Sequence, residues 1–154
     1  MKATSKATEP VVSITREYDA PRELVFAAWS DPAHLNRWFA PNGCTVECQL
    51  DFRVGGAIKT LIRHPQFGAC ECQGAYLEIV KPERIVYSLL SPEHCLKDGW
   101  PSETIVTVTL TEARGKTTLT LQQTVPLELA KRTGAYPSWL EMLDRLVAEL
   151  KLMA

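Results

Sequence analysis

Alternating apolar and polar positions dominate the middle of the chain, whereas apolar positions at helical spacing dominate the segments on either side. The β-branched stretch 11–18 predicts a first strand. Asp19-Ala20-Pro21 and Ser30-Asp31-Pro32 each combine a capping residue with a proline, which is typical of helix starts. Apolar residues follow both signals at helical spacing. We therefore expect two short helices directly after the first strand, the first of them capped by Asp19 or Ala20.

Residues 43–125 are predicted to form strands separated by turns. The expected strands are 44–52, 57–63, 70–80, 85–90, 104–111 and 117–124. In the first of them Val46, Cys48 and Leu50 share one face, and the glycine pair Gly55-Gly56 suits the turn that follows. Short connections between successive strands favour an antiparallel meander over parallel units. A longer polar loop is expected at 91–102.

The last segment changes period and predicts a long helix that begins near Pro137 or Ser138. Its apolar residues recur three or four positions apart: Trp139, Leu140, Leu143, Leu146, Val147 and Leu150. A stripe of this kind must be buried, and the concave face of the sheet is the available partner. Residues 127–131 are expected to add a further helical turn. The pattern predicts an α+β fold, with residues 1–10 as a disordered polar tail and residues 11–154 as a single domain.

Local motifs along the chain resemble one known family. They comprise Asp19–Phe26 followed by Trp29, Asp31–Phe39, Phe52–Gly56, Gly74–Ile79 with Pro82–Val86, and Trp139–Leu146. Together they resemble the family related to the activator of heat-shock protein 90 ATPase, within the START / Bet v 1-like (SRPBCC) superfamily. The resemblance implies a helix-grip fold, in which an antiparallel sheet wraps around the long C-terminal helix. It also implies an apolar pocket between the sheet and that helix.

Charge and composition exclude several classes of function. The chain of 154 residues has 17 Lys and Arg against 18 Asp and Glu, a formal charge of −1. No basic stripe indicates nucleic-acid binding, and no apolar run approaches the ~20 residues of a membrane span. The first ten residues lack the apolar core of a secretory signal. Five cysteines, an odd number, then predict reduced thiols and a cytoplasmic location.

Metal binding and nucleophilic catalysis find little support in the spacing of the candidate residues. Cys44 and Cys48 would lie roughly 13 Å apart on a strand, and Cys70 and Cys72 roughly 6–7 Å apart. Adjacent residues such as His94 and Cys95, which we expect in a surface loop, rarely aim at each other. The sequence also lacks the motifs of a nucleophile elbow and of a phosphate-binding loop. We therefore predict no catalytic residue, no metal site and no cofactor.

The resemblance leads to our hypothesis for function, the binding of a small and largely hydrophobic ligand in the pocket. The expected lining consists of bulky residues on the surrounding elements: Trp38, Phe39, Tyr76, Tyr87, Trp100, Trp139, Met142, Leu143 and Leu146. One or two inward polar groups would orient the ligand, drawn from Arg63, Glu71, Gln73 or Tyr76, because the pattern does not decide which strand face is inward.

Two alternatives of different class stay open at this point. The protein would act on a chaperone ATPase as an interaction partner, or it would be a cyclase or hydrolase with polar groups in the same pocket. A homodimer is compatible with the sequence but is not required by it.

Overall fold

The computed structural model describes residues 10–66 and 68–154, and the predicted polar tail lies outside this range apart from Pro10. The elements in chain order are β1 (Val11–Tyr18), α2 (Arg22–Ser30), α3 (Pro32–Trp38), β2 (Thr45–Leu50), β3 (Ala57–His64), β4 (Gly68–Val80), β5 (Arg84–Leu90), α4 (Glu93–Lys97), β6 (Glu103–Ala113), β7 (Lys116–Pro126), α5 (Leu127–Arg132) and α6 (Ala135–Met153). No helix in these ranges is long and apolar enough to cross a membrane.

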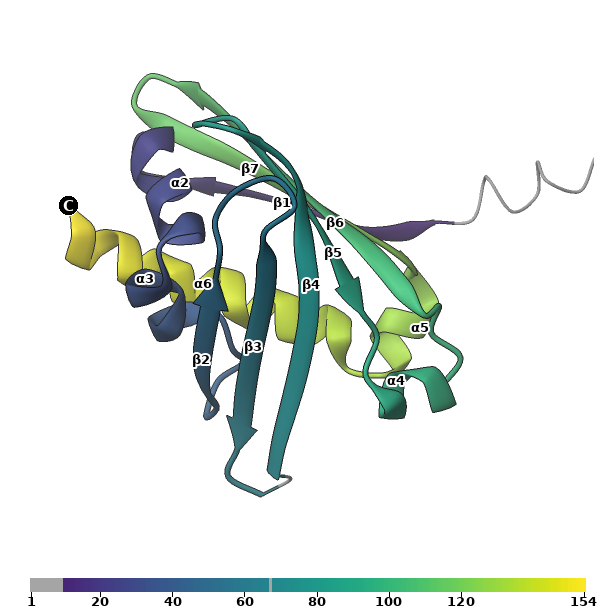
Figure 1. The fold of residues 1–154 in the computed structure, drawn as a ribbon. Helices are drawn as coiled ribbons and strands as arrows, with labels where there is room; N and C mark the ends of the chain where they lie inside the picture. Colours follow the sequence, from purple (N-terminus) through teal and green to yellow (C-terminus); the bar gives the residue numbers. More distant parts are fainter. Residues whose placement is uncertain (1–9, 67) are drawn as a thin grey trace, which may run out of the picture.

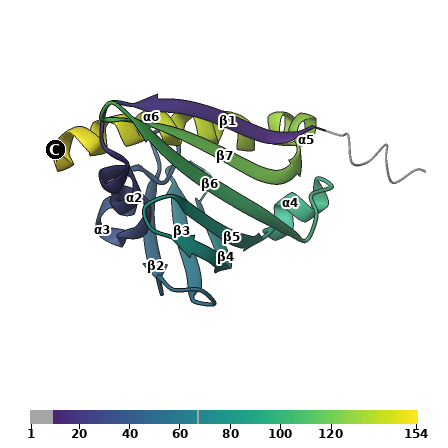
Figure 2. The ribbon, with the colours of Figure 1, turned by 90° about the horizontal axis from the view of Figure 1, so that it is seen from above.

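The strands form one seven-stranded antiparallel sheet in the order β1-β7-β6-β5-β4-β3-β2. Strands β2 to β7 are a meander, and β1 closes the other edge by pairing with β7. The sheet bends around α6, which crosses its inner face (Figures 1 and 2). Helices α2 and α3 lie beside the C-terminal end of α6, and α4 and α5 lie near its N-terminal end (Figure 1). The predicted α+β helix-grip fold is confirmed.

The two short helices begin in different ways. The side chain of Asp31 caps α3 by accepting a hydrogen bond from the backbone N–H of Ala33 at 2.9 Å, and Pro32 occupies the first turn. The capping residue of α2 is Pro21 rather than the expected Asp19 or Ala20, and its side chain accepts no hydrogen bond. Instead, the backbone N–H of Arg22 donates to Oε1 of Glu112 on β6 at 3.0 Å. A distant strand thus satisfies the donor that a local cap would normally satisfy.

The turn between β2 and β3 requires its glycine pair. Gly55 has a φ of +83°, in the left-handed region that side chains disfavour. At Gly56 a Cβ atom would lie 1.8 Å from the carbonyl oxygen of Asp51, so no other residue fits there. The chain can therefore make the turn from β2 into β3 only with glycine at these two positions.

Helix α6 buries a stripe that differs slightly from the predicted one. Trp139, Leu143, Leu146 and Leu150 are buried as expected, but Val147 is 42% exposed. Met142 and the carboxyl side chain of Glu149 are buried as well. The helix begins at Ala135, two to three residues earlier than expected, and the extra helical turn predicted at 127–131 is present as α5.

The predicted loop at 91–102 contains the short helix α4. Pro92 precedes the helix, and Gly99, with a φ of +97°, follows it. The indole N–H of Trp100 donates to the hydroxyl of Thr133 at 3.2 Å, which ties this segment to the end of α5. Most of the segment is exposed, as expected of a surface loop, and Cys95 and Trp100 are partly buried on its inner side.

Candidate functional site

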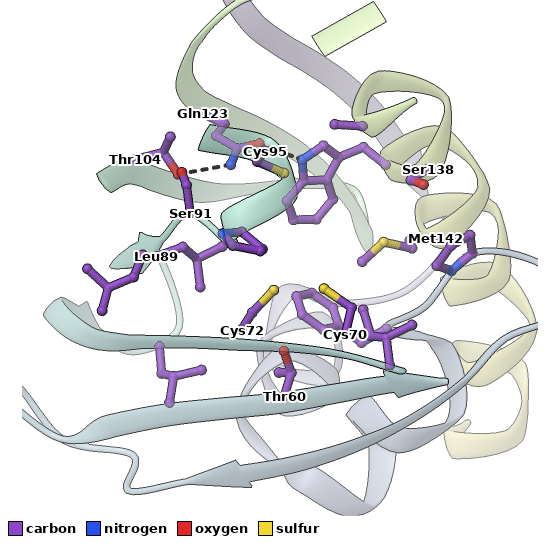
Figure 3. A pocket seen from close by; sticks show the side chains of 18 of the residues that line it. Thr60, Cys70, Cys72, Leu89, Ser91, Cys95, Thr104, Gln123, Ser138 and Met142 are labelled. Carbon is purple, nitrogen blue, oxygen red and sulfur yellow. Dashed lines mark hydrogen bonds between the residues drawn. The ribbon is translucent and has the colours of Figure 1, made fainter. Parts of the chain in front are cut away.

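A cavity of about 680 Å³ lies between the inner face of the sheet and the first turns of α6. Its floor consists of alternate residues of three neighbouring strands: Ile58, Thr60 and Ile62 of β3, Cys70, Cys72 and Tyr76 of β4, and Ile85, Tyr87 and Leu89 of β5. This set follows from the strand geometry, because every second side chain points to the same face. Figure 3 shows the cavity from close by.

Helices and loops supply the opposite wall. Its residues include Trp29 of α2, Leu35 of α3 and Phe39 after α3, then His94, Cys95 and Trp100 in and after α4, and Ser138, Trp139 and Met142 on α6. Trp139 is held in place because its indole N–H donates to Oε1 of Gln123 at 2.9 Å. The amide of Gln123 in turn donates to the hydroxyl of Thr104 at 3.0 Å (Figure 3).

The structure separates the expected lining residues into two groups. Those on the cavity wall are Phe39, Tyr76, Tyr87, Trp100, Trp139 and Met142. Those that do not line it, against our expectation, are Trp38, Leu143 and Leu146, all fully buried in the core. The cavity follows only the first turns of α6, and α2 and α3 pack against the helix in the remainder of the core. Trp38 is also fixed by a hydrogen bond from its indole N–H to the carbonyl of Ala28 at 3.1 Å.

Of the candidate polar groups, Tyr76 alone points inward. Arg63, Glu71 and Gln73 are exposed on the outer face of the sheet. There, Glu71 pairs with Lys59 at 3.3 Å and Arg63 with Glu47 at 3.8 Å. Tyr76 is 3% exposed and lines the cavity.

Three polar groups on the cavity wall find no hydrogen-bond partner within residues 10–66 and 68–154. They are the indole N–H of Trp29 and the hydroxyls of Tyr87 and Ser91. Trp29 and Tyr87 are 3% and 4% exposed, so most of each side chain is shielded from water. Burial raises the pKa of the Tyr87 phenol, which therefore stays protonated and able to donate. Buried donors without a partner are unusual and costly, and a bound acceptor would relieve that cost.

The cavity also contains thiols that sequence reasoning did not place in the site. Cys70 and Cys72 project from β4, and Cys95 and His94 come from α4. All five cysteines are free. Nevertheless, no group of three or more His, Cys, Asp or Glu side chains in the described ranges could hold a metal ion. The alternation of 70–80 places Cys70 and Cys72 on the same face as Tyr76, but it does not show that this face is inward.

Comparison with known proteins identifies the family. The family model described as "Activator of Hsp90 ATPase homolog 1-like protein" matches residues 19–151, which is most of the chain. The chain belongs to this family. The suspected resemblance is thereby confirmed, and the matched range contains every wall of the cavity.

Solved structures of other proteins share the fold. A protein from Chromobacterium violaceum is 29% identical, with a TM-score of 0.79, over 91% of this chain and 96% of its own. The AHSA1 protein from Silicibacter pomeroyi is 21% identical, with a TM-score of 0.74, over 94% of this chain and 100% of its own. A protein from Arthrobacter aurescens is 23% identical, with a TM-score of 0.80, over 90% of this chain and 84% of its own. The last two show the fold alone. No curated protein matches the sequence.

Proposed function

We propose that this member of the family binds a small, largely apolar ligand that carries a hydrogen-bond acceptor. The observation that carries the proposal is the combination of an apolar cavity of about 680 Å³ with unpartnered donors on its wall. Cavities of this size are typical of small-molecule sites, where apolar walls supply affinity and a few polar groups supply orientation. Phe39, Tyr76, Trp100, Trp139 and Met142 would supply most of the apolar contact.

The unpartnered donors narrow the ligand chemistry. An indole N–H can only donate, and a protonated phenol offers its O–H to an acceptor. A carbonyl or ether oxygen next to Tyr87 would therefore be satisfied, whereas a ligand with donors alone would not. The proposal includes a cytoplasmic location, where thiols such as those of the cavity stay reduced. A chaperone partner and a homodimer are not proposed, because no surface feature of the described residues argues for either.

A pair of probes tests both parts of the proposal. 2-Acetylnaphthalene and 2-ethylnaphthalene have similar shapes and differ in the carbonyl oxygen. We expect both to bind when titrated against the protein by fluorescence, with the ketone about fivefold to tenfold tighter, as one satisfied buried hydrogen bond implies. Tyr87→Phe should remove that preference and leave the binding of 2-ethylnaphthalene unchanged. A ketone preference that persists in Tyr87→Phe would exclude the Tyr87 hydroxyl as its source.

A cavity-filling variant tests the location. Met142→Trp places an indole in the space beside α6 and should weaken both probes at least about tenfold by excluding them sterically. Val147→Trp is the matched control, because Val147 lies on the outer face of the same helix and is 42% exposed. It should bind both probes as the wild type does. Equal binding by the two variants would place the ligand elsewhere and refute the proposal.

A further inference from the structure

Two thiols lie side by side on the floor of the cavity. Cys70 and Cys72 occupy alternate positions of β4, so both point to the inner face, and Thr60 of β3 lies directly opposite Cys72 in the sheet. Figure 3 shows both sulfur atoms directed into the cavity, with Cys95 on the opposite side. Cys70 and Cys72 are half-buried, so a ligand in the cavity can reach them.

The two thiols are chemically unequal. The Cys72 thiol donates a hydrogen bond to the sulfur of Cys70, and this bond lowers the pKa of Cys70 below that of an ordinary thiol. Burial acts against this effect, and the nearby His94 adds to it. The same hydrogen bond and burial raise the pKa of Cys72, while the Thr60 hydroxyl, which also bonds to Cys72, opposes the rise. Cys70 is therefore the member of the pair that ionises more readily.

The surroundings distinguish Cys70 from Cys95 and Cys48. Burial raises the pKa of both Cys95 and Cys48. The other titratable groups that line the cavity are His64 of β3, Tyr76 of β4, Tyr87 of β5, Cys44 before β2, and His94 and Cys95 of α4. Tyr87 lines the same cavity and its hydroxyl has no partner within the described residues, so an unpartnered donor accompanies the thiol pair.

We propose that Cys70 covalently captures an apolar ligand bearing an α,β-unsaturated carbonyl group, by conjugate addition within the cavity. The inference rests on the proposed function, because the apolar walls must first bind the ligand. A thiolate in an apolar cavity is matched to a soft electrophilic carbon, and the carbonyl oxygen is the acceptor that Tyr87 lacks. Disulfide formation would need an oxidant, whereas this addition needs only the thiolate and a proton donor.

The bond changes balance without a further reactant. The lone pair of the Cys70 sulfur forms a C–S bond to the β-carbon, and the C=C π pair moves to give an enolate on the carbonyl oxygen. The Tyr87 O–H stabilises this oxygen by a hydrogen bond. The α-carbon then takes up a proton from solvent, which replaces the proton that Cys70 released to solvent when it ionised. The sum is the addition of one S–H across one C=C bond. This addition needs no oxidant and no reductant.

The test uses trans-3-nonen-2-one, an apolar enone, with the saturated 2-nonanone as its unreactive counterpart. Intact-mass spectrometry and peptide mapping after equimolar treatment at neutral pH should show one adduct, on Cys70. Cys70→Ser should slow adduct formation roughly tenfold or more, since its hydroxyl is a far weaker nucleophile. Cys48→Ala, which removes a buried thiol that does not line the cavity, should react like the wild type. An excess of 2-nonanone should slow the wild-type reaction by competition.

Cys72 is a positioning residue in this scheme, and its test is a pH profile. Cys72→Ala removes the hydrogen bond to Cys70 and should move the midpoint of the rate profile to higher pH. Cys72→Ser keeps a donor and should restore the midpoint in part. A midpoint that is the same in all three proteins would overturn the assigned role of Cys72.

The failure of this inference is distinguishable from failure of the proposed function. Reversible binding of 2-nonanone, measured by native mass spectrometry, reports on the function alone. If 2-nonanone binds but the enone labels the cysteines indiscriminately or leaves Cys70 unmodified, covalent capture is refuted and ligand binding stands. If neither compound binds, both proposals fail. Peptide mapping of the wild-type protein separates these outcomes even where a cysteine variant folds poorly.

Discussion

The two ends of α6 lie in surroundings of opposite kind, although both carry apolar residues at the same spacing. Its first turns, with Trp139 and Met142, border a cavity of about 680 Å³. Further along, Leu143 and Leu146 are fully buried, and α2 and α3 pack against the helix. The comparison shows that an amphipathic stripe determines which face is buried, and that the elements packed opposite determine whether the space there is filled.

Aromatic packing marks the border between the two regions. Trp29 contacts Trp38 edge to face at 4.8 Å between ring centroids, and it stacks on Trp139 at 6.5 Å. Trp38 belongs to the filled region, whereas Trp29 and Trp139 line the cavity. The filled end therefore supports one wall of the hollow end.

The largest effect is expected at Trp38. Trp38→Ala removes a fully buried indole together with its hydrogen bond to Ala28, which should reduce the free energy of unfolding by about 3–5 kcal/mol. Urea denaturation followed by circular dichroism measures this. A loss below about 1 kcal/mol would contradict the view that the region around Trp38 is tightly packed.

Truncation on α6 compares the two ends directly. Leu146→Ala opens a void in the filled region. It should reduce the free energy of unfolding by about 3 kcal/mol, within the range for truncation of a buried leucine. Met142→Ala extends a cavity that already exists, so its side chain loses fewer contacts and the cost should be about 1–2 kcal/mol. Both are measured by the same urea titration. Equal losses would remove the distinction between the two ends.

A polar contact joins α3 to α6 at the filled end. Its loss should have an intermediate effect on the free energy of unfolding. Nδ1 of His34 on α3 lies 2.7 Å from Oε2 of Glu149, which is 4% exposed, and Arg37 lies 3.8 Å from its other oxygen. Glu149→Gln should reduce the free energy of unfolding by about 1–3 kcal/mol, because it weakens the contacts of this buried carboxylate with His34 and Arg37.

The matched control for Glu149 is Asp144 on the same helix. Asp144 forms an ion pair with Arg16 but its side chain is 69% exposed. Asp144→Asn should therefore change the free energy of unfolding by less than about 1 kcal/mol. A larger loss at Asp144 than at Glu149 would show that the link between α3 and α6 contributes little.

The smallest effect is expected at Tyr87, inside the hollow end. Tyr87→Phe removes a hydroxyl that has no partner within the described residues, so the ligand-free protein should be unchanged or more stable by up to about 1 kcal/mol. Thermal denaturation with and without 2-acetylnaphthalene measures both states. Without the ketone, Tyr87→Phe should be as stable as the wild type or more stable. The ketone should stabilise Tyr87→Phe less than it stabilises the wild type. A large loss of stability without ligand would mean that the hydroxyl has a structural role.

Much of the fold could be predicted from periodicity and turn residues. The two-residue alternation of the strands, the Asp31-Pro32 start of α3 and the Gly55-Gly56 turn depend on local backbone geometry, which neighbouring residues decide. The cap of α2 and the helix α4 were not predicted. The first depends on Glu112, 90 residues away in the chain. The second is five residues long and buries none of its side chains, so no apolar stripe marks it in the sequence.

The candidate site was predicted less completely. Tyr76, Tyr87 and Trp139 were expected on the cavity wall because they are bulky and lie on the elements around the expected pocket. The residue pair Cys70 and Cys72 was not, since the exposed Glu71 and Gln73 lie on the same strand with equal spacing. Which of these two faces is inward depends on how the sheet curves around α6, and no local pattern reports that curvature.

Periodicity and local motifs were enough to establish the order of elements, the antiparallel sheet, the buried stripe of the last helix and the family. The packed structure was needed to show that Leu143 and Leu146 fill a core while Met142 borders a cavity, and that the Cys70 and Cys72 thiols point into that cavity. Burial of an apolar side chain is favourable against any apolar neighbour, so the sequence pattern is the same for a core and for a cavity wall. The volume between them is a property of how several elements pack together.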